Sequence, residues 1–70
     1  MKHNIILEKF PVNRKIAIIK VVWNLIGLGL KGAKTLVNST PTVIKEALTP
    51  DFAFNAKKEL EAMGATVSLK

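Results

Sequence analysis

Three groups of residues in this 70-residue chain have types or spacings that could support chemistry: a run of glycines, a pair of glutamates and a single histidine. Residues 27–32 read G-L-G-L-K-G, which matches the G-x-G-x-x-G pattern of a dinucleotide-binding turn. That turn follows a strand inside a βαβ unit, whereas a helical pattern precedes these glycines and the chain is too short for two mononucleotide-binding halves. We therefore interpret the glycines as a tight turn between two helices and expect no nucleotide cofactor.

The acidic pair and the histidine are equally poor candidates for catalysis. Glu59 and Glu61 are two residues apart, and side chains at that spacing do not face each other on a helix. His3 lies beside the N-terminus, and the chain contains no Cys, which removes thiolate metal sites and Ser-His-Asp or Cys-His catalysis. We expect no catalytic residue, no metal site, no cofactor and no enzyme activity.

The length of the chain predicts one small domain over residues 1–70. Surface scaling lets a chain of this size bury only about 60% of its surface, so the core is thin and a deep active-site cleft is not expected. The longest apolar stretch, residues 16–30, is interrupted by Lys20 and Asn24 and is shorter than the roughly 20 residues of a membrane-spanning helix. We expect no membrane association.

Positive charge is concentrated in one part of the sequence. The chain has 11 Lys and Arg against 5 Asp and Glu, for a net charge of +6. Residues 9–45 contain seven of the basic residues and no acid, which gives +7 there and 4 − 5 = −1 elsewhere. This distribution favours a negatively charged partner for the first half of the chain.

Hydrophobic periodicity and helix-boundary residues predict the element order β-α-α-β-α-β. The predicted strands are residues 4–10, 42–48 and 65–69, and the predicted helices are residues 14–26, 28–38 and 50–63. Asn13 is expected to cap the first helix. Thr49 is expected to cap the third, with Pro50 at its first position and Gly64 as its C-cap.

Helical periodicity also assigns faces. The predicted core positions are Ile18, Ile19, Val21, Val22, Leu25 and Ile26 in the first helix, Leu28, Ala33, Leu36 and Val37 in the second, with Leu30 at the edge, and Phe52, Ala53, Ala56, Leu60 and Met63 in the third. Trp23 lies beside Lys20 on the opposite face of the first helix. It is either part of a contact surface or covered by a neighbouring helix, and Phe54 presents the same two alternatives.

Several short runs in the chain resemble the C-terminal domain of the bacterial ribosomal large-subunit stalk protein, the seven/twelve protein. They are K-I-A-I-I-K-V-V at residues 15–22, G-L-G-L-K at 27–31, A-K at 33–34, L-V at 36–37, K-E at 45–46, A-K-K at 56–58, L-E at 60–61 and G-A at 64–65. The resemblance covers about residues 4–70. It implies an α+β fold in which three helices cover a three-stranded, mainly antiparallel sheet, in the order already predicted.

The resemblance also implies a function: a non-catalytic ribosomal protein domain of the large-subunit stalk that recruits translational GTPases to the ribosome. The GTPases are elongation factors G and Tu, an initiation factor and a release factor. The resemblance further implies that the domain acts at the ribosome in the cytoplasm or in an organelle matrix or stroma. The family's contact residues map onto Lys15, Ile16, Ala17, Ile19, Lys20, Leu30, Lys31 and Lys34, to which we add Trp23. Ile19 lies at the edge of the predicted core face, so its contact role rests on the resemblance alone.

The chain also departs from the family pattern. Trp23 stands where the family usually has Arg, and Gly32 where it usually has an acid, which shifts the surface toward apolar contact and makes it more uniformly positive. Met1 leads almost directly into the first strand. We therefore expect either a piece of a longer protein or a free-standing copy without the family's dimerising region and hinge. The alternative function is an RNA-binding or other protein-binding module, in which the lysines contact phosphates and Trp23 stacks on a base.

Overall fold

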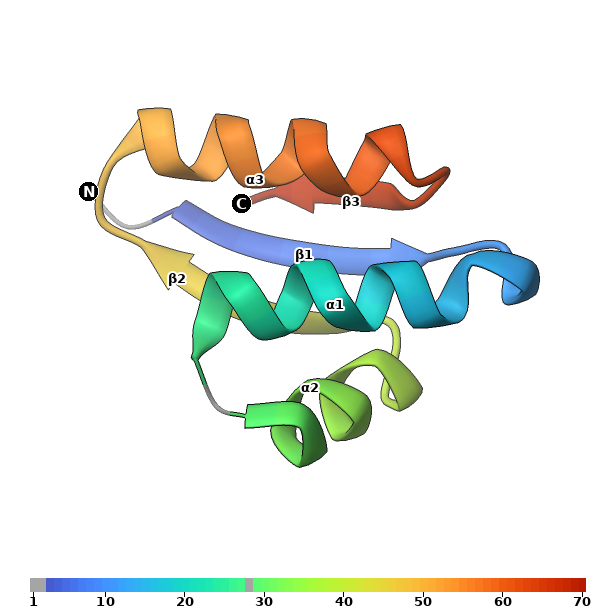
Figure 1. Ribbon diagram of the computed structural model, residues 1–70. Coiled ribbons are helices and arrows are strands. Elements are labelled where there is room, and N and C mark those ends of the chain that lie inside the picture. The colour runs from blue at the N-terminus through green and yellow to red at the C-terminus, as the bar shows by residue number, and fades with distance from the viewer. Residues whose placement is uncertain (1–2, 28) are drawn as a thin grey trace.

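The sheet is built around β1 (His3–Lys9), which pairs antiparallel with β2 (Thr42–Ala47) on one side and with β3 (Thr66–Leu69) on the other, in the order β2-β1-β3. The computed structural model describes residues 3–27 and 29–70 (Figure 1). Ile5 and Leu7 alternate along β1 and are fully buried, as expected for a strand with one face on a core. The predicted three-stranded antiparallel sheet is confirmed.

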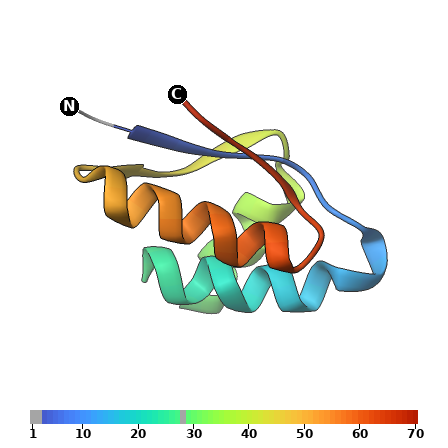
Figure 2. The same ribbon diagram turned by 90° about the horizontal axis from the view of Figure 1, so that it is seen from above.

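Three helices cover this sheet: α1 (Lys15–Ile26), α2 (Gly29–Asn38) and α3 (Pro50–Ala62). They lie on the same side of the sheet, so the core forms between the helices and the inner face of the strands (Figure 2). The predicted order β-α-α-β-α-β and the α+β class are therefore confirmed. No helix in residues 3–27 and 29–70 is long and apolar enough to cross a membrane.

The entry to α1 differs from the prediction. A short 3-10 helix, η1 (Val12–Arg14), precedes α1, and the Arg14 N–H donates to the Pro11 carbonyl at 2.9 Å. Asn13 lies inside this turn, and the cap position of α1 is Arg14, without a side-chain hydrogen bond. The prediction of Asn13 as N-cap was wrong because the chain begins to wind two residues earlier, directly after Pro11.

The ends of α3 agree better with expectation. The Thr49 hydroxyl accepts a hydrogen bond from the Phe52 N–H at 3.2 Å, and Pro50 occupies the first turn, so the predicted N-cap is confirmed. The C-cap is Met63, one residue before the predicted Gly64. Gly64 follows it with φ +88°, a left-handed conformation that glycine adopts without a steric penalty.

The predicted core faces are largely confirmed. Buried apolar residues come from every helix and strand: Ile5, Leu7, Ile18, Ile19, Val22, Ala33, Val37, Ile44, Ala47, Ala53, Ala56, Leu60, Ala65 and Val67. Val21, Leu25, Ile26, Leu36 and Met63 pack partly against them. Leu28 lies outside the described residues.

The three large aromatic positions of the helices are more exposed than a core position would be. Phe52 was predicted to be buried but is 37% exposed, because it lies in the first turn of α3 and its ring contacts the Lys45 side chain. Phe54 is 57% exposed and Trp23 is 42% exposed. Of the two alternatives left open for each residue, the structure therefore supports a position on the surface.

Candidate functional site

Helix α1 presents a mixed basic and apolar face to solvent. Lys20 is exposed, and Ile16 and Trp23 lie one turn away from it in either direction, at 73% and 42% exposure. Residues at i, i+4 and i+7 share one face of a helix. Lys15 and Ala17, also predicted as contact residues, are half-buried near the start of the same helix. The face combines a cation with an aliphatic and an aromatic side chain.

The turn that follows α1 allows α2 to pack against it. Gly27 has φ +67°, its N–H donates to the Trp23 carbonyl at 3.1 Å, and Gly29 has φ +81°. These left-handed conformations close α1 and redirect the chain within a few residues. The glycine run therefore connects two helices, which is not the strand-to-helix context of a dinucleotide fingerprint.

Helix α2 adds a second set of exposed side chains. Leu30 is 43% exposed, and Lys31 and Lys34 are exposed beside it. Ala33 and Val37 of the same helix are buried in the core, which fixes the rotation of α2 and leaves the two lysines toward solvent. Because α1 and α2 pack against each other, the two sets lie on neighbouring helices (Figure 1).

We use the name α1–α2 surface for the predicted contact residues that keep exposed or half-buried side chains. They are Lys15, Ile16, Ala17, Lys20, Trp23, Leu30, Lys31 and Lys34. Ile19 is 7% exposed and belongs to the core cluster, so little of its side chain is available to a partner. Its contact role stays a prediction from the resemblance.

The charge on these helices has one sign. Helices α1 and α2 contain four lysines and no acidic residue. The five acids of the chain lie elsewhere: Glu8 on β1, Glu46 on β2, and Asp51, Glu59 and Glu61 on α3. Four cations on two packed helices that carry no acid of their own produce a positive potential that attracts acidic partners over about one Debye length, roughly 8 Å at physiological salt.

Metal-ligating side chains are not brought together in the described part of the chain. Residues 3–27 and 29–70 contain no group of three or more His, Cys, Asp or Glu residues that could hold a metal ion. The α1–α2 surface offers a partner cations, a Trp ring and aliphatic side chains.

Two features of the surface were not predicted from the sequence. Val12, in η1, is 86% exposed directly before α1. A shallow hollow lies at the junction of β2 and α3, where Leu48 and Phe52 are exposed beside Lys45. The sequence carries only a weak signal for this hollow. Phe52 has the spacing of the buried residues of α3, and only its position in the first turn of the helix sets it apart from them.

Comparison with known protein families supports the resemblance seen in the sequence. The family model described as the ribosomal protein L7/L12 C-terminal domain matches residues 3–70. The match includes every helix and strand of the fold and the whole of the α1–α2 surface.

Proposed function

This chain belongs to the ribosomal protein L7/L12 C-terminal domain family, and we propose that its α1–α2 surface binds translational GTPases and brings them to the ribosome. Membership of this family implies a role in the large-subunit stalk and in translation. The family is one of ribosomal proteins and not of enzymes. The proposal adds the partner, elongation factors G and Tu and the initiation and release factors, and the residues that contact it.

The observation that carries this proposal is the arrangement of exposed apolar and basic side chains on α1 and α2. Ile16, Trp23 and Leu30 are between 42% and 73% exposed, and lysines lie on the same two helices. Apolar side chains surrounded by charge are typical of a protein-binding surface. The positive potential speeds encounter with an acidic partner, and a small apolar contact keeps dissociation fast. Rapid exchange suits a domain that must deliver and release factors repeatedly.

An RNA-binding role is the second candidate, and the exposure of Trp23 is the observation that favours it. A Trp ring that is 42% exposed beside a lysine could stack on an unpaired base while the lysines contact phosphates. Both candidate functions depend on charge, so weakening by salt would not separate them. The identity of the partner would.

The test is a pair of NMR titrations of the ¹⁵N-labelled chain at physiological salt, one with elongation factor G and one with a short single-stranded RNA. We expect the factor to shift amide signals within residues 15–34 and the RNA to leave them unchanged. Shifts with RNA alone would refute the proposal and would mean that the family fold serves a different partner in this chain.

A further inference from the structure

A hollow of about 280 Å³ lies where β2 ends and α3 begins. Its lining residues are Lys45, Glu46, Ala47, Leu48, Thr49 and Phe52. None of them belongs to the α1–α2 surface, and the family function proposed above does not use them. The hollow is shallow and open, so it does not enclose a small molecule in the way a cofactor pocket does.

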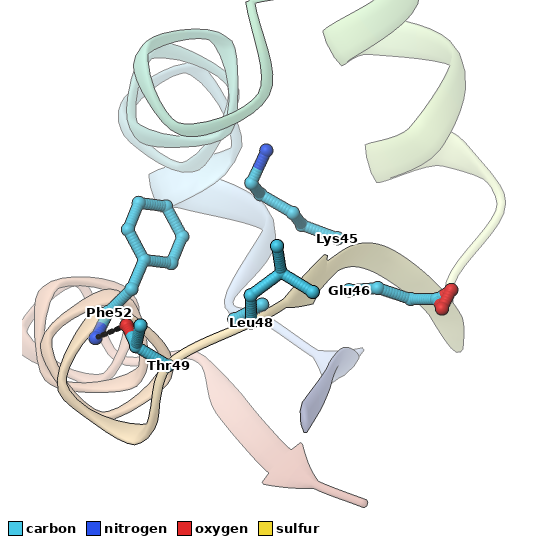
Figure 3. A pocket seen from close by; sticks show the side chains of 6 residues that line it. Lys45, Glu46, Leu48, Thr49 and Phe52 are labelled. Carbon is cyan, nitrogen blue, oxygen red and sulfur yellow. Dashed lines mark hydrogen bonds between the residues drawn. The ribbon is translucent and has the colours of Figure 1, made fainter. Parts of the chain in front are cut away.

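One part of the hollow is apolar. Leu48 is 75% exposed and Phe52 is 37% exposed. Figure 3 shows both side chains pointing into the same space, together with the end of Lys45. Two large apolar side chains exposed side by side at a turn favour contact with an apolar group of a ligand.

The other part of the hollow is cationic. The Lys45 Nζ atom lies 5.6 Å from the centroid of the Phe52 ring, a distance typical of a cation–π contact. The ring of Phe52 is the contact that the structure gives for the Lys45 ammonium. Within residues 3–27 and 29–70, no side chain or carbonyl accepts a hydrogen bond from the Lys45 N–H groups. The neighbouring Glu46 carboxylate points away from Lys45 (Figure 3). Lys45 is half-buried as a residue, and its ammonium has hydrogen-bonding capacity left for an anion.

Thr49 fixes the start of α3 at the edge of the hollow, because its Oγ1 atom accepts the Phe52 N–H at 3.2 Å as the helix cap (Figure 3). The hollow therefore combines one cation, Lys45, with two large apolar side chains.

We propose that this hollow binds an acidic peptide segment of a partner protein, in which a carboxylate lies next to a large apolar side chain. The carboxylate contacts the Lys45 ammonium, and the apolar side chain packs on Leu48 and Phe52. Charge complementarity selects an acidic segment over a basic one. The open shape selects a segment held in place by the rest of its protein, because the hollow alone covers little of a ligand.

The experiment is an NMR titration of the ¹⁵N-labelled chain with the capped peptide acetyl-Leu-Asp-Leu-Glu-amide. Its neutral counterpart, acetyl-Leu-Asn-Leu-Gln-amide, is titrated in parallel. We expect the acidic peptide to shift the amide signals of residues 45–52 in a saturable manner. The neutral peptide should bind about fivefold more weakly, the upper end of what one exposed charge pair contributes.

The chain offers a matched control for the cation. Lys58 lies over the Phe54 ring at the same 5.6 Å, but on the exposed side of α3 and outside the hollow. Lys45→Gln should weaken the acidic peptide about fivefold, whereas Lys58→Gln should leave its affinity unchanged within about twofold. Leu48→Ser tests the apolar half, and its side chain is 75% exposed, so the fold tolerates the change.

Three results would overturn the proposal: no shifts in residues 45–52, equal affinity for the acidic and neutral peptides, or equal effects of Lys45→Gln and Lys58→Gln. If the Lys45→Gln variant does not fold, the proposal is still tested by comparing the affinities of the two peptides for the native chain and by the affinity of the acidic peptide for the Leu48→Ser variant. Elongation factor G is titrated into the same samples. Factor-induced shifts on the α1–α2 surface without peptide binding would reject this proposal and leave the proposed function standing.

Discussion

Replacing Lys20 by Glu tests the α1–α2 surface most directly. Lys20 is exposed in the middle of the mixed face of α1, and the residues three and four positions away from it are uncharged. The new carboxylate therefore has no neighbouring lysine on its own helix with which to pair. The four lysines of α1 and α2 give these helices a charge of +4, and the substitution lowers it to +2.

The expected loss of affinity follows from the size of one charge contact. A pair of opposite charges at about 4 Å contributes ~1 kcal/mol in water, and reversal replaces this attraction by a repulsion of similar size. The binding free energy should fall by about 2 kcal/mol, a Kd increase of roughly 30-fold. Stability should change by less than about 0.5 kcal/mol, because the side chain is exposed and away from the core.

Lys58→Glu is the matched control, because it lowers the net charge from +6 to +4 in the same way but lies on α3. The Kd for elongation factor G is measured by isothermal titration calorimetry for the native chain and both variants, with thermal melts alongside. Lys58→Glu should raise the Kd less than about threefold, since only long-range screened attraction is lost. If both variants raised the Kd equally, the effect would be one of net charge and not of a contact at Lys20. An unchanged Kd for Lys20→Glu would refute the placement of the surface.

Three further predictions concern the packing, and each is tested by urea denaturation. Trp23→Ala should cost about 1–2 kcal/mol, below the roughly 3–5 kcal/mol of a core Trp, because the ring is 42% exposed, and it should also weaken factor binding; a loss above about 3 kcal/mol would contradict the surface position. Gly64→Ala should destabilise more than Gly27→Ala, since both have positive φ but a Cβ at Gly64 meets Pro11 Cγ at 3.0 Å and one at Gly27 meets nothing within 4 Å; equal costs would contradict the close approach. Thr49→Ala should cost about 1 kcal/mol and Thr49→Ser much less, because the hydroxyl caps α3; equal losses would contradict the cap.

The order of the elements could be predicted from the sequence because local signals mark most boundaries. Pro11 ends the first strand, Gly27 ends α1, and Thr49 with Pro50 begins α3. Between these points the apolar spacing changes from alternation to helical periodicity, so the type of each element follows. The same periodicity predicted the buried side of α1, where Ile18 and Val22 are fully buried.

The features that were missed depend on contacts between elements or on the path of single turns. The 3-10 turn forms because the Arg14 N–H reaches the Pro11 carbonyl, and a good capping residue at position 13 obscures it. Phe52 has the spacing of a core residue, but the first turn of α3 leaves its ring partly exposed beside Lys45. Whether α2 covers Trp23 depends on how the two helices cross, which helical periodicity does not specify.

Exposed aromatic and basic side chains occur on two helices of this protein, and charge separates their roles. Phe54 and Lys58 on α3 form such a pair, with the Lys58 Nζ atom 5.6 Å from the Phe54 ring. Helix α3 carries two lysines against Asp51, Glu59 and Glu61, so its formal charge is 2 − 3 = −1. The lysines of α1 and α2 have no acid on either helix. Because steering requires a net potential as well as a contact, the exposed pair on α3 is less suited than the α1–α2 surface to attract an acidic partner over a distance.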